Sequence, residues 1–344
     1  MTWLRVFLVL FLVPVPLAAQ EDIARFGAGP QPFLIRSTTD IAIIRPLIQR
    51  FADTRPDLTI TYEQWGSNAL FDRSRADCRQ QSQPADAVLS SAVQQMVWLV
   101  NAACAQPHRS DVTAQLPQTR RWRDELWGIT LEPAVIAYNR TAFSGGTVPK
   151  SRFALLDALR ADPERFRNRI ATYDIATSGL GFLFAFSDSL EATTFGALLE
   201  SFARVDAVAT CCSAEIITGV ANGRYLVAYN VLGSYVASAN HPEVGVILPE
   251  DYTLVLSRAF MIPRGARQAQ AAAALLDFLL TPEAQAMLTQ VGLVFSLDAA
   301  ETGLAASARR PIALSPSLMV GLDAARRQQL LDAWSETFQP GWLP

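Results

Sequence analysis

Two extended stretches, "GITLEPAVIAYN" (Gly128–Asn139) and "YTLVLSRAFMIP" (Tyr252–Pro263), decide the fold predicted for this chain. Each is a long run of residues typical of β-strands. Pro133 lies in the middle of the first stretch, where it suits an edge or a crossing segment better than a central strand. The two stretches divide the chain into three blocks, and the simplest construction uses both as connections between two lobes.

The outer blocks then form one discontinuous lobe, residues 20–135 and 256–344, and the middle block forms the other, residues 136–255. Short strand-like runs alternate with helical ones in both lobes, as in an open α/β sheet. The predicted strands include "PFLIRS", "LTITYEQ", "ADAVLSS" and "RIATYDIA". The predicted fold class is therefore α/β, with open sheets in two lobes joined by a hinge of two crossings. A chain of 344 residues is long enough for two such lobes.

The first residues predict export. Arg5 supplies a positive charge, residues 6–17 form an apolar run of signal-peptide length, and small residues at 17–19 suit cleavage before Gln20. We therefore expect residues 1–19 to be removed as a signal peptide and the mature chain to be periplasmic. No cysteine lies at the junction, so a lipoprotein anchor is not expected.

The four cysteines fit an oxidising compartment. A bond between Cys78 and Cys104 would tie two neighbouring helical segments, although spacing alone does not determine connectivity. Cys211 and Cys212 are adjacent, and three states stay open for them: a mutual bond, free thiols, or packing as small apolar side chains.

The motifs of common enzyme classes are missing. The glycine-rich stretch at 177–181 has neither the lysine of a phosphate-binding loop nor the full dinucleotide fingerprint, and G-x-S-x-G does not occur. His108 and His241, the only histidines, form no metal-binding pair. We therefore expect no enzyme, no cofactor and no metal site. The net charge of −3 does not favour nucleic acid as a partner, since phosphate binding usually leaves a basic footprint.

Small hydroxyl residues follow a strand and precede a helix at three places in the chain. Backbone N–H groups and the positive end of the dipole at a helix start favour anions, and glycine permits close approach. Any one such junction is more often an ordinary helix cap, but ligands of open α/β sheets bind at the carboxyl ends of strands, where all three lie. The candidate ligand-binding residues at these junctions are Ser37, Thr38, Ser90, Ser91, Thr177, Ser178, Gly179 and Gly181.

Three further polar residues are candidates for the same site. Tyr229 and Asn230 lie in "VAYNVLGSY" at the end of a predicted strand, where they could orient a ligand or bridge the lobes. Glu132 lies in the first crossing. It could accept hydrogen bonds from ligand hydroxyls or pair with an arginine, and the sequence does not separate the two.

The order of these segments resembles the periplasmic solute-binding proteins of ABC transporters. Within them it resembles the group of ferric-iron-type binding proteins and the phosphoglycerate-transport regulatory protein. The resemblance covers nearly all of the predicted mature chain. The resembling stretches are "ADAVLSSAVQQMVWLVNAACA", "WGITLEPAVIAYNRTAF", "ATYDIATSGLGFLFA", "VAYNVLGSY", "LPEDYTLVLSRAFMIPRGA" and "AAALLDFLLTPEAQAML". It implies the type II fold of this family, with a ligand clamped between the lobes.

The resemblance also implies a ligand class and partners. Ferric members use adjacent tyrosines, whereas in this chain five residues lie between Tyr229 and Tyr235, so iron is not expected. A small phosphorylated or carboxylated anion is the leading class, captured by a monomer for an ABC permease. The alternatives are a sensory binding protein that signals to a membrane histidine kinase and, less favoured, an exported hydrolase.

Overall fold

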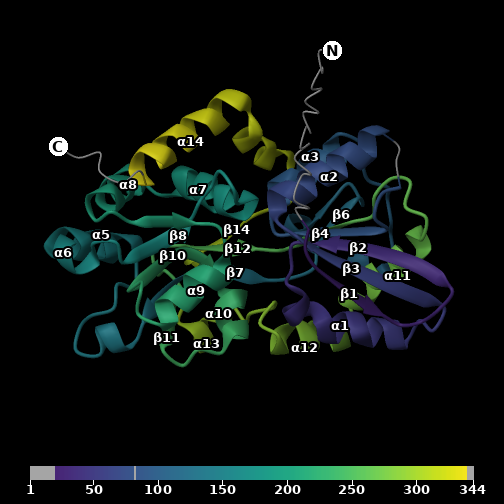
Figure 1. The fold of residues 1–344 in the computed structure, drawn as a ribbon, viewed down its shortest axis with the longest axis horizontal. Helices are drawn as coiled ribbons and strands as arrows, with labels where there is room; N and C mark the ends of the chain where they lie inside the picture. Colours follow the sequence, from purple (N-terminus) through teal and green to yellow (C-terminus); the bar gives the residue numbers. More distant parts are fainter. Residues whose placement is uncertain (1–19, 81–82, 339–344) are drawn as a thin grey trace, which may run out of the picture.

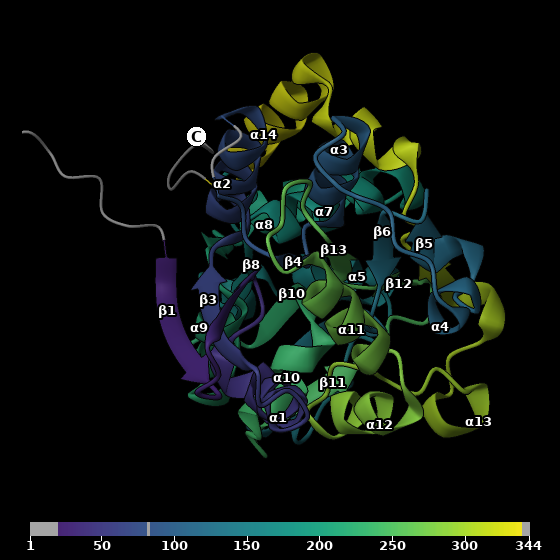
Figure 2. The same ribbon diagram turned by 90° about the vertical axis from the view of Figure 1, so that its right-hand side faces the viewer.

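The chain folds into two α/β lobes side by side (Figure 1). The structure is a computed structural model that describes residues 20–80 and 83–338, so the predicted signal peptide lies outside the described residues. Each lobe is built around one mixed sheet whose faces are covered by helices (Figures 1 and 2). The predicted α/β class with open sheets in two lobes is confirmed.

The first sheet runs in the order β1-β3-β2-β4-β13-β6-β5. Strands β2, β3 and β4 are parallel, and β13 joins them antiparallel to β4. The strands of this sheet are β1 (Gln20–Phe26), β2 (Gln31–Ser37), β3 (Leu58–Trp65), β4 (Ala87–Ser90), β5 (Arg121–Trp122), β6 (Leu126–Gly128) and β13 (Ala259–Met261).

The second sheet runs in the order β14-β12-β7-β10-β8-β9, and β11 pairs with the far part of β7. Strands β8, β9 and β10 are parallel to one another. The strands of this sheet are β7 (Glu132–Asn139), β8 (Ile170–Tyr173), β9 (Val208–Thr210), β10 (Val227–Leu232), β11 (Val244–Ile247), β12 (Thr253–Leu256) and β14 (Arg309–Pro311).

Amphipathic helices cover both sheets, with their apolar faces turned inward. Around the first sheet lie α1 (Ile41–Asp53), α2 (Ser67–Gln80), α3 (Val93–Asn101), α4 (Asp111–Ala114), α11 (Ala269–Leu279) and α12 (Pro282–Gln290). With the second sheet are α5 (Arg152–Ala161), α6 (Pro163–Phe166), α7 (Gly179–Glu191), α8 (Phe195–Arg204), α9 (Ser213–Ala221), α10 (Gly233–Ala239), α13 (Ala299–Thr302) and α14 (Ala324–Phe338). Short 3₁₀ turns are η1 (Gln118–Arg120), η2 (Thr141–Phe143), η3 (Ala306–Ala308) and η4 (Pro316–Leu322).

Both extended stretches cross from one sheet to the other. The first leaves the first sheet with β6 and enters the second with β7, so β7 joins the second sheet from Glu132 onward, a few residues before the predicted boundary at residue 135. The second stretch runs back from β12 to β13 through Ser257 and Arg258. A third segment passes beside the first crossing, where the Leu131 N–H donates to Leu293 O at 3.1 Å.

The tail corrects one expectation. Residues 256–344 were expected to join the first lobe, but β14 and α14 belong to the second, because β14 pairs in parallel with β12 and α14 packs against α8. Trp334 is buried with Phe182 and Phe186 of α7, and its indole N–H donates to Tyr173 O at 3.1 Å. Trp334 of α14 therefore finds its apolar partners on the second lobe.

Within the described residues, no single helix is long and apolar enough to cross a bilayer. The consecutive pair α11 and α12 reaches that length and composition only together, with a bend of 70° between them. Their apolar side chains, including Leu275, Leu276 and Leu288, are buried in the core of the first lobe.

The predicted bond between Cys78 and Cys104 is present, joining the end of α2 to the segment after α3 with their Cα atoms 5.4 Å apart. Cys211 and Cys212 are also bonded to each other. Of the three states left open for this pair, the structure has the mutual bond.

We expect the double substitution Cys78→Ser and Cys104→Ser to lower the free energy of unfolding. The bond closes a loop with a sequence separation of 26, and a loop of that size is worth about 3.5 kcal/mol by the chain-entropy relation. Equilibrium unfolding in urea measures the loss. An unfolding midpoint equal to that of the parent would contradict a stabilising role for this bond.

Candidate functional site

A buried ion pair joins the two crossings. Arg258, in the second crossing, donates from Nε and Nη2 to the two carboxylate oxygens of Glu132 in the first, at 2.8 and 3.1 Å. Both side chains are at most 1% exposed. Thr130 completes the pair, because its hydroxyl donates to Glu132 at 2.6 Å and accepts from the Arg258 N–H at 2.8 Å. Of the two roles left open for Glu132, the structure has the pairing with an arginine.

The same pair faces the first of the three predicted junctions. Arg258 Nη1 donates to the Thr39 hydroxyl at 3.0 Å, and its guanidinium lies 5.7 Å from the ring centre of Tyr235. Burial opposes the positive charge, yet the Glu132 carboxylate, with Tyr235 and Asp40, holds the pKa of Arg258 above its usual value. Arg258 therefore stays charged, and Glu132 balances that charge.

Tyr235 reaches from α10 of the second lobe to the start of α1 in the first. Its hydroxyl donates to Asp40 Oδ1 at 2.8 Å. Burial and the nearby Asp40 carboxylate raise the pKa of the Tyr235 hydroxyl well above its ordinary value, despite the opposing Arg258 charge. Tyr235 is therefore a neutral donor that links the lobes beside the hinge.

The junctions after β2 and β4 lie against each other. The Thr38 and Ser91 hydroxyls are 3.2 Å apart, and the Ser91 N–H donates to Thr38 Oγ1 at 3.0 Å. Ser37 and Ser90 instead accept hydrogen bonds from the backbone two residues further on, at 3.0 and 3.1 Å. Thr38 and Ser91 thus form a shared hydroxyl surface, while Ser37 and Ser90 stabilise their own turns.

The third junction, at the start of α7, is in direct contact with the first lobe. The Gly179 N–H donates to Ser67 Oγ at 2.8 Å, and Gly179 O accepts from Gln94 Nε2 at 2.7 Å. Asn68 Nδ2 donates to the carbonyls of Ala176 and Thr177 at 3.1 and 3.0 Å. Both ribbon views place α2 and α3 beside α7 (Figures 1 and 2). We call these contacts of Ser67, Asn68 and Gln94 with residues 176–179 the interlobe latch.

The remaining predicted residues of this junction have local roles. Ser178 is the N-cap of α7, and its hydroxyl accepts from the Gly181 N–H at 3.0 Å. The Thr177 hydroxyl lies 3.0 Å from Asp174 Oδ2. A side chain at Gly181 would overlap Tyr173 inside the second lobe. Gly179 is different, because a Cβ there would lie 2.7 Å from Gln95 Nε2 and 3.0 Å from Asn68 Oδ1, both in the first lobe.

The latch residues Ser67, Asn68 and Gln94, and Gln95 beside them, were missed from the sequence. Ser67 and Asn68 follow β3 in "QWGSNAL" and repeat the strand–small polar–helix pattern, so this fourth junction had a readable signal. The two glutamines had none, because nothing in "SAVQQMVW" indicates that they are at most 7% exposed. Among the described residues, Gln94 Oε1 and Gln95 Oε1 are buried without a hydrogen-bond partner, which leaves acceptors unused beside the latch.

Tyr229 and Asn230 do not face these junctions, which corrects their expected role. Both lie inside the second lobe, where the Tyr229 hydroxyl and Asn230 Nδ2 donate to Asp188. Arg152 bonds the same carboxylate and also donates to Asn230 Oδ1 at 3.2 Å. The backbone of Asn230 adopts an uncommon φ of +52°, and its side-chain amide is held by these two partners. The ion pair Arg152–Asp188 is at most 1% exposed. Because Tyr229 and Asn230 are hydrogen-bonded to it, both are part of the core of the second lobe.

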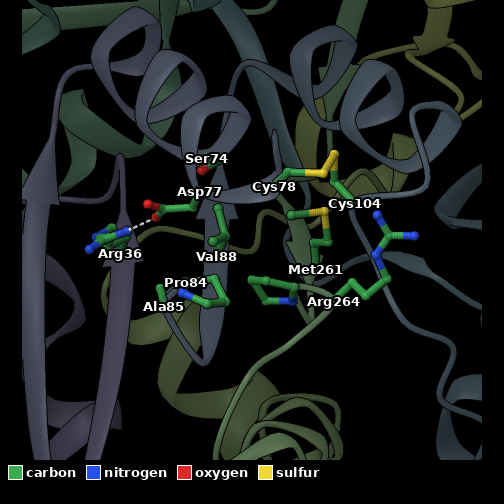
Figure 3. Close-up of a pocket in the computed structure, with 11 residues that line it drawn as sticks. Arg36, Ser74, Asp77, Cys78, Pro84, Ala85, Val88, Cys104, Met261 and Arg264 are labelled. Atoms are coloured by element: carbon green, nitrogen blue, oxygen red, sulfur yellow. Dashed lines mark hydrogen bonds and ion pairs between the residues drawn. A yellow bond between two sulfur atoms is a disulfide. The ribbon is translucent and has the colours of Figure 1, made fainter. Parts of the chain in front are cut away.

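Two cavities away from the latch are poorer candidates. Figure 3 shows one inside the first lobe, beside the Cys78–Cys104 bond and the Arg36–Asp77 ion pair; its volume of about 10 Å³ suits one water molecule at most. A cavity of about 470 Å³ lies on the second lobe, beside Lys150 and Glu250. Those two side chains are more than 60% exposed and 3.8 Å apart. Water screens their charges, so they would bind a ligand only weakly.

The sequence profile of the bacterial extracellular solute-binding proteins matches residues 36–286. A substrate binding protein of an ABC transporter from Agrobacterium tumefaciens is 30% identical, with 93% of this chain and 99% of that chain covered and a TM-score of 0.86. A search among curated proteins found no match.

Two more distant structures share the fold alone. AfuA from Actinobacillus pleuropneumoniae, solved with fructose-6-phosphate, is 14% identical, covers 91% of this chain and 100% of its own, and has a TM-score of 0.69. The apo ferric ion-binding protein A from Pasteurella haemolytica is 17% identical, with the same coverage and a TM-score of 0.68. The expected type II fold of periplasmic binding proteins is confirmed.

We expect Glu132→Gln to lower the free energy of unfolding by about 3–5 kcal/mol, because it leaves the Arg258 charge buried without its partner. The matched control is the double substitution Glu132→Gln and Arg258→Met, which removes both charges and recovers much of that loss. Urea unfolding of the parent, the single variant and the double variant measures these changes in the free energy of unfolding. A single variant as stable as the parent would mean that the pair does not stabilise the hinge.

The two glycines of α7 provide a second, matched test. Gly179→Ala places a methyl group against Gln95 and Asn68, so it should open the lobes while leaving the melting temperature close to that of the parent. Gly181→Ala meets Tyr173 within one lobe, so it should lower the free energy of unfolding by about 1–3 kcal/mol without opening the lobes. Small-angle scattering and thermal melts separate the two. A radius of gyration unchanged by Gly179→Ala would contradict the latch.

Proposed function

This chain belongs to the bacterial extracellular solute-binding proteins, and from that premise we propose that it captures a small phosphorylated or carboxylated anion between its lobes in the periplasm. The captured anion is then delivered to an ABC permease. The family is one of binding proteins, and the substrate binding protein from Agrobacterium tumefaciens supports the transport role.

The observation that carries the proposal is the hydrogen bond between the Gly179 N–H and Ser67 Oγ, 2.8 Å long. Gly179 is the first residue of a 13-residue helix, so its N–H lies at the positive end of the helix dipole. Ser67 is in the opposite lobe. When the lobes part, this N–H loses its acceptor, and an oxygen of an anionic ligand takes the place of the serine hydroxyl.

Neutral donors hold the anion in this proposal, because the charged groups at the hinge already have partners, and the Asp40 carboxylate accepts a hydrogen bond from Tyr235. The Arg258 charge is matched by Glu132, and Tyr235 is neutral. The groups left to bind a ligand are then hydroxyls, side-chain amides and backbone N–H groups, among them Thr38, Ser91 and the latch residues. Such donors select a ligand by the positions of its acceptor atoms, since each buried donor must meet an acceptor when the ligand is desolvated.

The ligand is identified by purifying the protein without denaturation, releasing what it carries, and analysing the release by mass spectrometry. We expect a stoichiometric phosphate or carboxylate compound, which raises the melting temperature when added back. If the ligand is lost during purification, a thermal-shift screen of phosphorylated and carboxylated metabolites identifies compounds that bind. A neutral or cationic compound, or no shift with any anion in the screen, would overturn the proposed ligand class.

We also predict that the ligand is not ferric iron. Tyr229 is committed to Asp188 and Tyr235 to Asp40, so the two phenols do not converge on one point. Among the described residues, no group of three or more His, Cys, Asp and Glu side chains is arranged to hold a metal ion. Iron bound by phenolates gives a visible absorption band. A coloured protein, or one that takes up one iron per chain from ferric citrate, would show this prediction to be wrong.

A further inference from the structure

The bond between the adjacent residues Cys211 and Cys212 takes no part in the interlobe site. It lies between β9 and α9, at the carboxyl end of the second sheet, and both cysteines are exposed. The register pairs Thr210 of β9 with Tyr173 of β8, and the Asp174 N–H donates to Thr210 O at 2.8 Å. The bond therefore lies directly beside the loop that carries Ala176 and Thr177 of the latch.

The second disulfide of the molecule is a natural comparison. Cys104 is only 5% exposed and belongs to the core of the first lobe, and Cys78 is half-buried against the same core. A thiolate in solution must reach a sulfur atom before it can exchange with it, because exchange proceeds through direct attack. In the folded protein, Cys211–Cys212 is open to that attack and Cys78–Cys104 is shielded.

The position of Cys212 also favours its departure as a thiolate. Cys212 is the N-cap residue of the nine-residue helix α9, and its side chain makes no capping hydrogen bond while it is in the disulfide. The N–H groups and dipole at a helix start stabilise a thiolate, which makes the sulfur a better leaving group. Glu215 in the first turn and the nearby Asp174 oppose this, although Glu215 is held by a hydrogen bond from Thr210 at 2.8 Å.

We propose that Cys211–Cys212 is a thiol-exchange site of this protein, open to a small thiol or to the dithiol of an oxidoreductase. An attacking thiolate forms a bond to the Cys211 sulfur, and the bond between the two cysteines breaks as Cys212 leaves as a thiolate. A second thiolate then attacks the mixed disulfide and releases Cys211. Two electrons pass to the protein pair, two external thiols become one disulfide, and Cys78–Cys104 stays intact.

The test uses the full protein and dithiothreitol as the thiol. Folded protein is treated with a few equivalents of dithiothreitol, new thiols are blocked with N-ethylmaleimide, and peptides are mapped by mass spectrometry. We expect labels on Cys211 and Cys212 within a time in which Cys78 and Cys104 stay unlabelled, and labels on all four after unfolding in guanidinium. Labelling of the two pairs at equal rates, or no labelling before unfolding, would overturn the proposal.

A matched control is the double variant Cys211→Ser and Cys212→Ser. It should release no thiol under the folded conditions, and labelling of Cys78 and Cys104 in it at the rate seen for the parent pair at 211–212 would also overturn the proposal. The wild-type measurement stands alone if this variant does not fold. The labelling experiment needs no ligand, so its result does not depend on whether the protein binds the proposed anion.

Discussion

The ion pair between Glu132 and Arg258 connects the two segments that carry the chain from lobe to lobe. Two opposite charges with almost no exposure stabilise each other, since an isolated buried charge is strongly unfavourable. The pair therefore ties the crossings together at one point. Arg258 also donates to Thr39, which follows β2, so the hinge and the first polar junction form one hydrogen-bonded unit.

From that fixed point the lobes face each other through hydrogen bonds whose donors are neutral. Tyr235 reaches Asp40 beside the hinge, and further out Ser67, Asn68 and Gln94 meet the start of α7. The tail adds a bridge of another kind, because η4 packs on α3 of the first lobe while α14 stays on the second. Neutral hydrogen bonds exchange readily for bonds to a ligand or to water, whereas the buried ion pair does not. This difference suits a molecule that opens at the latch and keeps its hinge.

Much of this architecture could be predicted from the chain, and what was missed has physical reasons. The crossings and the strand ends follow from local pattern, which sequence carries well, whereas the Cys78–Cys104 bond was a candidate pairing that spacing alone did not determine. The position of α14 depends on the apolar surface against which Trp334 packs, and local sequence does not determine that tertiary contact. Tyr229 and Asn230 have the chemistry of ligand-binding residues, but their use depends on Arg152, which is 77 and 78 residues away in the chain. Ser67 and Asn68 repeat the pattern of the other junctions and could have been found.

The most direct test of the account is the amide resonance of Gly179, followed by NMR while the anion identified from the purified protein is titrated in. Amide shifts respond strongly to a change of hydrogen-bond acceptor. If the ligand's anionic group replaces Ser67 at the start of α7, the Gly179 amide should show one of the largest shifts in the protein, saturating with the calorimetric affinity. A Gly179 amide that stays unchanged at saturation, while residues such as Lys150 or Glu250 shift, would contradict the account.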